Sequence, residues 1–112
     1  MKINKIAIIG LGYVGLPLAV SLSKSFKVLG LDINKKRIKE LKSGNDSTNE
    51  VSSINLKKSI NKNLDITSEE SGLSECNIYI VTVPTPVTKS NEPDFSYLRN
   101  SCKMIGSKMK KN

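Results

Sequence analysis

Short apolar runs alternate along the chain with longer segments in which apolar residues recur at helical spacing. The runs are rich in β-branched residues and apolar on both faces, which is typical of buried parallel strands. Strands that alternate with helices over short connections predict an α/β fold in which helices cover a parallel sheet. We expect strands at 6–9, 27–31, 64–67 and 77–83, and helices at 16–25, 35–42, weakly at 51–63, and from 95 onward.

Individual residues predict how these helices begin and which faces they bury. Asn34 is a good cap for the second helix and Asp94 for the last one. Ile54 and Ile60 are possible anchors of the weak third helix. Five apolar residues at helical spacing predict the buried face of the last helix: Phe95, Leu98, Cys102, Ile105 and Met109.

The first strand runs into the sequence Gly10-Leu11-Gly12-Tyr13-Val14-Gly15, whose glycine spacing fits a dinucleotide-binding turn. Gly10 permits a tight turn, Gly12 has no side chain to hold a pyrophosphate off the backbone, and Gly15 lets the next helix lie close to the sheet. That helix offers unpaired N–H groups and its positive dipole end to the phosphates. The spacing alone is a weak signal, and its place between a predicted strand and a predicted helix makes it specific.

Asp32 ends the second predicted strand about 20 residues after Gly12, where the acid that binds the adenosine ribose is expected. Its carboxylate accepts hydrogen bonds from ribose hydroxyls and repels a 2′-phosphate, so the sequence favours NAD over NADP. The nearby cations Lys35, Lys36 and Arg37 could accommodate a phosphate, although solvated helix surface is the simpler interpretation of the two lysines.

The fourth predicted strand ends in Thr82-Val83-Pro84-Thr85-Pro86. In an open α/β sheet, ligands bind outside the carboxyl ends of the strands, at the point where the strand order reverses. With a Rossmann-type order of 3-2-1-4, this segment lies beside the first strand, and Thr85 could reach the ribose on the nicotinamide side. A plain turn from strand to loop is the equal alternative for Thr85.

Composition excludes several other classes of function. The net charge is +8, but the lysines are scattered and the five aromatic residues do not interleave with them, so we expect no nucleic-acid partner. Cys76 and Cys102 form no C-x-x-C motif and the chain has no histidine, so we expect no metal site and buried, reduced thiols. Without a signal peptide or an apolar run of about 18 residues, we expect a cytoplasmic protein with no membrane partner.

Three segments resemble the UDP-glucose/UDP-N-acetylmannosamine family of nucleotide-sugar 6-dehydrogenases. They are residues 5–19, with the string Gly-Tyr-Val-Gly-Leu-Pro, residues 30–38, and residues 80–94, with the string Val-Pro-Thr-Pro. Their details look closest to the branch that makes UDP-N-acetylhexosaminuronic acids, such as the UDP-N-acetylgalactosamine dehydrogenases of capsule or O-antigen synthesis.

The resemblance implies a four-electron oxidation, with two NAD molecules, of the C6 alcohol of a UDP-sugar to a carboxylate. It implies a thioester on a cysteine that no residue of this chain matches, so we assign no catalytic residue and expect the chain alone to be inactive. The cofactor contacts that it implies are the backbone of Tyr13 and Val14 at the pyrophosphate, Asp32 and Arg37 around the adenosine ribose, and Thr85 near the nicotinamide half.

We interpret residues 1–112 as a truncated NAD-binding Rossmann domain, without the central helix and the UDP-sugar-binding domain of such enzymes. The strand near 78–83 would then lie at an open sheet edge. We expect the chain to form a homo-oligomer or to cover that edge with its last helix. A stand-alone NAD-binding regulatory module is the alternative function. The two strings argue against hydroxyacid and hydroxyacyl-CoA dehydrogenases.

Overall fold

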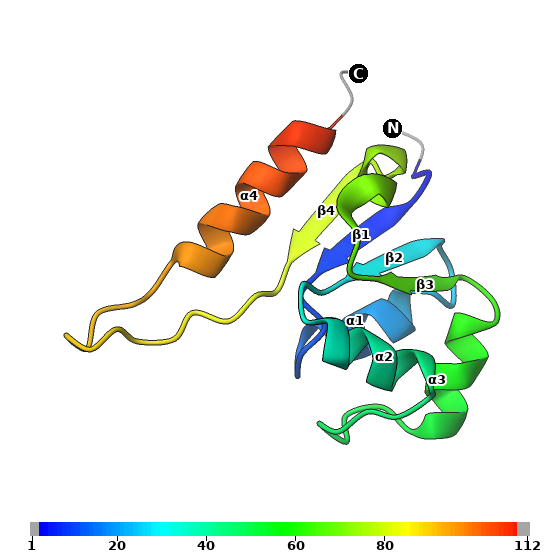
Figure 1. Cartoon of the computed structure of the whole chain (residues 1–112). Coiled ribbons are helices and arrows are strands. Elements are labelled where there is room, and N and C mark those ends of the chain that lie inside the picture. Colours follow the sequence, from blue (N-terminus) through cyan, green and yellow to red (C-terminus); the bar gives the residue numbers. More distant parts are fainter. Residues whose placement is uncertain (1–2, 110–112) are drawn as a thin grey trace.

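The computed structural model describes residues 3–109, and its elements follow the predicted alternation (Figure 1). All four strands are parallel, in the order β3-β2-β1-β4, so the prediction of a Rossmann-type sheet with order 3-2-1-4 is confirmed. The strands are β1 Ile6–Ile9, β2 Val28–Leu31, β3 Leu64–Thr67 and β4 Ile78–Val81. The helices are α1 Gly15–Leu22, α2 Lys35–Lys42, α3 Ser53–Ile60 and α4 Ser96–Lys108, with a 3-10 segment, η1, at Glu70–Glu75.

Two hydrophobic layers enclose the sheet, one on each face. Ile6 and Ile8 of β1 pack into the layer that also holds the buried residues of α1, α2 and α3. Ala7 and Ile9 pack into the opposite layer, with residues of η1 and α4. Figure 1 shows α1, α2 and α3 grouped on one side of the sheet and α4 apart from them, alongside β4. Cover on both faces explains why the strands are continuous apolar runs rather than alternating ones.

The direction of the strand order reverses between β1 and β4. From β1 the chain continues outward through β2 to β3, and it returns through η1 to the other side of β1, where Ile9 aligns with Val81 of β4. Parallel strands end at the same edge of the sheet, so the carboxyl ends of β1 and β4 flank a crevice. In open α/β sheets this switch point is where ligands bind.

The N-cap was predicted correctly from the local sequence for α2 but not for α4. Asn34 caps α2 as predicted, because its Oδ1 accepts hydrogen bonds from the N–H groups of Lys36 (3.0 Å) and Arg37 (3.2 Å). The prediction that Asp94 caps the last helix is wrong, since Phe95 occupies the N-cap position of α4. Asp94 instead accepts a hydrogen bond from the N–H of Ser96 (2.9 Å) from one residue further out.

The buried face of α4 also differs from the prediction. Ser101 is buried, and Met104 and Ile105 pack into the layer beneath η1. Of the five predicted residues only Ile105 is turned inward. The other four are exposed: Phe95, Leu98, Cys102 and Met109. The prediction of buried thiols therefore holds for Cys76 and is wrong for Cys102.

β4 is an edge strand, since among residues 3–109 its single strand partner is β1. α4 packs against β4 and η1 through Met104 and Ile105, on the face of the sheet. Self-association of the chain stays a prediction.

The anchor of α3 is Leu56, which is fully buried, whereas Ile54 is 80% exposed, so the prediction for Ile54 is wrong. The helix begins after Ser52, whose Oγ accepts a hydrogen bond from the N–H of Asn55 (3.2 Å). This start places Leu56 and the partly buried Ile60 four residues apart on one face, the spacing that stacks side chains along a helix.

Replacing Leu56 with Ala should lower the free energy of unfolding by about 2–5 kcal/mol, because it leaves a cavity beneath the sheet. Ile54→Ala, on the exposed side of the same helix, should change it by less than about 0.5 kcal/mol. Urea unfolding followed by far-ultraviolet circular dichroism measures both variants. Equal losses would show that α3 packs through a different face.

Candidate functional site

A cleft of about 740 Å³ opens at the carboxyl ends of β1, β2 and β4, at the switch point of the sheet. The glycine turn after β1 and the segment after β4 line it from the sheet. The end of β2, the β2–α2 loop and Arg37 form one wall, and α4 forms the other. The α4 wall consists of Tyr97, Asn100, Ser101 and Met104.

The glycine turn is pressed against the end of β4. Gly10 has a φ of +100°, and a Cβ there would lie 2.7 Å from the carbonyl oxygen of Thr82. A Cβ on Gly15 would lie 1.8 Å from the carbonyl oxygen of Gly10 and 2.4 Å from Oγ1 of Thr82. A Cβ on Gly12, by contrast, would meet no atom within 4 Å. The turn therefore has no room for a side chain at Gly10 and Gly15, where it touches the sheet. It is bare, meaning that no side chain covers the backbone, at Gly12, where it faces the cleft.

The amino terminus of α1 leaves backbone N–H groups available beside the cleft. Val14 occupies its N-cap position and makes no capping hydrogen bond through its side chain. The first N–H groups of a helix have no partners within the helix. Tyr13 and Val14 are 69% and 66% exposed, so this part of the turn is open to solvent. An uncapped helix terminus with a bare turn in front of it suits an anion such as a diphosphate.

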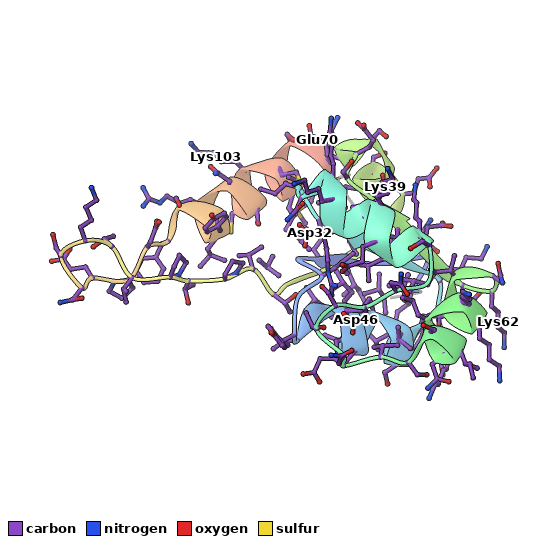
Figure 2. The ribbon with its side chains drawn as sticks, turned by 60° about the horizontal axis from the view of Figure 1, so that its bottom comes forward. Asp32, Lys39, Asp46, Lys62, Glu70 and Lys103 are labelled. Atoms are coloured by element: carbon purple, nitrogen blue, oxygen red, sulfur yellow. The ribbon has the colours of Figure 1, made fainter. Side chains whose placement is uncertain are left out.

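Asp32 is fixed in the cleft by two backbone groups. Its Oδ2 accepts a hydrogen bond from the N–H of Leu11 and its Oδ1 one from the N–H of Asn34, both at 2.9 Å. Figure 2 shows Asp32 just before the start of α2, and the same residue lines the cleft. Each carboxylate oxygen has a second lone pair. The oriented carboxylate can therefore still accept hydrogen bonds from two hydroxyl groups of a ligand.

Arg37 holds the other side of Leu11. Its Nε donates to the carbonyl oxygen of Leu11 (2.8 Å), and its Nη1 donates to Oδ1 of Asp46 (2.9 Å) and to Glu40. The Arg37 side chain is only 10% exposed. Among the described residues its Nη2 is buried and has no hydrogen-bond partner. Arg37 is thus part of the cleft wall, and two carboxylates pair with its guanidinium.

Sequence reasoning missed Asp46, which lies in the loop between α2 and α3. The Asp46 side chain is fully buried and accepts hydrogen bonds from the Thr48 N–H and hydroxyl and from the N–H groups of Glu50 and Val51. Burial opposes its ionisation, but the hydrogen bonds from Thr48, Val51 and Arg37 outweigh this effect and lower its pKa to about 2. The signal in the sequence was an Asp two residues before a Thr, a common turn pattern.

The structure brings together most of the predicted cofactor contacts. The predicted residues on the cleft wall are Gly10, Gly12, Tyr13, Val14, Asp32 and Arg37. Gly15 is buried behind the turn, and Thr85 is exposed and does not line the cleft. Thr82 does line it, and its Oγ1 donates a hydrogen bond to the Gly10 carbonyl oxygen (2.8 Å). Contact of each predicted residue with a cofactor stays a prediction.

Sequence reasoning also missed the wall formed by α4, because a long loop separates this helix from β4 (Figure 1). Within this loop, Val87 and Pro93 form an antiparallel bridge, and the N–H of Asp94 donates to the carbonyl oxygen of Pro86 (2.6 Å). The chain thus doubles back and returns to the cleft at Tyr97. No period or motif in the sequence encodes this return.

Other kinds of site find little support in the part of the chain that the structure describes. Residues 3–109 contain no group of three or more His, Cys, Asp or Glu side chains placed to hold a metal ion. Within the same range, no helix has both the length and the apolar character needed to cross a membrane. Burial raises the pKa of the Cys76 thiol, which favours its unreactive neutral form. The exposed lysines labelled in Figure 2, Lys39, Lys62 and Lys103, lie on separate segments.

The family model for the NAD-binding domain of the UDP-glucose/GDP-mannose dehydrogenase family matches residues 4–112. The chain belongs to this family. Both the predicted family and the predicted cofactor, NAD, are thereby confirmed at the level of the domain.

Relatives agree with the family model. UDP-N-acetyl-D-glucosamine 6-dehydrogenase of Pseudomonas aeruginosa is 47% identical over 99% of this chain and 26% of its own length. The enzyme of that name from Salmonella typhi is 50% identical over 92% of this chain and 24% of its own. A solved structure of UDP-D-ManNAc dehydrogenase from Pyrococcus horikoshii matches with a TM-score of 0.87 and 32% identity, over 94% of this chain and 26% of that one. The chain thus spans about a quarter of the length of the curated relatives that it matches.

Gly12→Ala and Gly15→Ala should separate the two tasks of the glycine turn. Gly15→Ala should lower the free energy of unfolding by about 3 kcal/mol or more, because its Cβ would overlap the Gly10 carbonyl oxygen. Gly12→Ala has room for its methyl group and should keep the melting temperature, but should weaken NAD binding by about tenfold or more. Thermal unfolding and isothermal titration calorimetry measure the two effects. Unchanged NAD binding by Gly12→Ala would show that no phosphate rests there.

The low pKa of Asp46 predicts a loss of stability in acid. A carboxyl group whose pKa falls from 3.8 to about 2 on folding stabilises the fold above pH 3.8, and this stabilisation is lost as the pH falls towards 2. The gap in unfolding free energy between the parent and Asp46→Asn should shrink by about 2 kcal/mol between pH 5 and pH 2. Chemical unfolding across this range tests the prediction, and a gap that is independent of pH would contradict it.

Proposed function

We propose that this chain holds NAD for a UDP-sugar 6-dehydrogenase, in which the C6 alcohol of the sugar is oxidised to a carboxylate. The observation that carries the proposal is the bare turn at Gly10–Gly15 with the fixed carboxylate of Asp32 one strand away. The names of the two bacterial relatives support the same reaction. NAD, when bound, supplies the acceptor for the hydride that leaves the sugar.

The residues of this chain bind and orient the cofactor. The backbone of Gly12, Tyr13 and Val14 and the amino terminus of α1 receive the diphosphate, which supports the predicted roles of Tyr13 and Val14. Asp32 accepts hydrogen bonds from the adenosine ribose. Apolar surface for the adenine is offered by Ile33 on one wall of the cleft and by Met104 on the other.

The charges around the cleft support NAD over NADP. Asp32 would repel a 2′-phosphate. Arg37, the cation nearest to it in the cleft wall, is already paired with Glu40 and Asp46, so its charge is not free for that phosphate. Beside the adenosine ribose, Arg37 therefore acts by supporting the turn that binds the cofactor, through its hydrogen bond to Leu11.

The remaining assignments concern a longer protein. We propose a UDP-N-acetylhexosamine as substrate, in the synthesis of capsule or O-antigen sugars, because the relatives with the highest identity cited above carry that substrate class in their names. A cytoplasmic homo-oligomer and a place for Thr85 near the nicotinamide half belong to the same proposal. No side chain of this chain is assigned to the chemical steps.

Titration with NAD and with NADP tests the proposal. The parent should bind NAD at least about tenfold more tightly than NADP, and Asp32→Ala should weaken NAD binding and reduce this preference. Asp65→Ala, which removes a carboxylate from the exposed surface of β3, should leave both affinities unchanged. Equal affinity of the parent for the two cofactors would remove the assignment of Asp32.

A further inference from the structure

Among the described residues of the Gly10–Gly15 turn, only Leu11 forms hydrogen bonds to side chains outside the turn through both its N–H and its carbonyl oxygen. Asp32 accepts from its N–H, and Arg37 donates through Nε to its carbonyl oxygen. That carbonyl belongs to the same planar trans peptide unit as the N–H of Gly12. The direction of the Leu11 carbonyl therefore fixes the direction in which the Gly12 N–H points. Gly12 is the residue at which the turn is bare.

Arg37 can fix this peptide only if its own guanidinium is held. Arginine has a long side chain that loses rotamer entropy when it is ordered. Two carboxylates oppose this loss, Glu40 from the next turn of α2 and Asp46 from the loop beyond α2. The Glu40 side chain is 29% exposed, whereas that of Asp46 is fully buried. Water therefore screens the contact of Arg37 with Asp46 less than its contact with Glu40.

Asp46 is itself fixed by its own loop. Its Oδ2 accepts from the N–H groups of Glu50 and Val51, and its Oδ1 accepts from Thr48 and from Arg37. Among residues 3–109, each hydrogen-bond partner of this carboxylate is thus a donor. An Asn side chain presents one NH₂ group, so at either position it would place a donor against donors.

We infer that Asp46 is a positioning residue for the diphosphate of the dinucleotide, acting through Arg37 and the peptide between Leu11 and Gly12. The inference rests on the proposed binding of NAD. Asp46 itself lies outside the cleft lining. It holds the guanidinium so that Nε meets the Leu11 carbonyl oxygen, and the turn then presents its backbone to the diphosphate without further ordering.

The test compares ligands with and without a diphosphate. Binding of NAD and of adenosine to the purified protein is measured by calorimetry and by NMR titration. Asp46→Asn should weaken NAD binding about tenfold and leave adenosine binding within about twofold, because adenosine has no diphosphate to meet the turn. Thr48→Val is the matched control, since it removes a donor to the same Oδ1 but keeps the contact with Arg37. It should lower the melting temperature and leave NAD affinity unchanged.

Arg37→Lys provides a second variant, in which the positive charge remains but the Nε donor to Leu11 is lost. It should weaken NAD binding to the same extent, and Asp46→Asn added to it should cause no further loss, since both act through one contact. Strictly additive losses would overturn the inference, as would equal losses for NAD and adenosine in Asp46→Asn.

The two proposals fail in distinguishable ways. If the parent binds NAD and Asp46→Asn binds it equally well, the positioning role is overturned and the proposed function stands. A parent that does not bind NAD overturns both. If Asp46→Asn does not fold, Arg37→Lys decides alone, and parental NAD affinity in that variant overturns the positioning role.

Discussion

The architecture of the site depends on one close approach, that of the glycine turn to the end of β4. The Thr82 N–H donates to the carbonyl oxygen of Ile9 (2.8 Å) and its Oγ1 to that of Gly10, so the end of β4 is bonded to the backbone that leaves β1. A Cβ on Gly10 would overlap the Thr82 carbonyl oxygen, and a Cβ on Gly15 would overlap the Gly10 carbonyl oxygen and Oγ1 of Thr82. With the turn folded this closely, α1 starts at the switch point of the sheet. The cleft and the orientation of α1 follow from this contact.

A second constraint is that buried polar groups must find partners, and here they gather around the turn. A buried charge is costly unless it is paired and hydrogen-bonded. Arg37 and Asp46 satisfy each other, and through Leu11 and Asp32 their contacts reach the cleft. The same contacts therefore stabilise the loop after α2 and shape the turn. The unpaired Nη2 of Arg37 shows that this buried network is close to complete but not ideal within residues 3–109.

Predictions from the sequence succeeded where the cause is local and failed where a distant segment decides. The bounds of β1 and α2 and the cap at Asn34 depend on neighbours in the chain, and all three were predicted correctly. For α3 and α4 the sequence offered more apolar residues than the sheet can cover, and only tertiary packing selects Leu56 and Ile105.

In the site, too, features with a local cause were predicted and features that depend on a distant segment were not. The fingerprint located the turn and Asp32, because glycine spacing and strand length are encoded within about 20 residues. Asp46 escaped prediction because its burial depends on Arg37, on another element. The sequence analysis singled out Thr85 rather than Thr82 for a similar reason. Only the pairing of β4 with β1 shows that the Thr82 hydroxyl is the one that contacts the turn.

The way in which charge is distributed over the cleft explains why the turn has to be bare. Asp32 is anionic, and Arg37, the one cationic side chain among the described lining residues, is neutralised by two carboxylates. None of the lysines among residues 3–109 lines the cleft. Attraction for a diphosphate must come instead from backbone N–H groups and the dipole of α1, whose effect falls off within one turn of the helix. Such short-range attraction works only if the phosphate can approach the backbone closely, and a side chain at position 12 would prevent that approach.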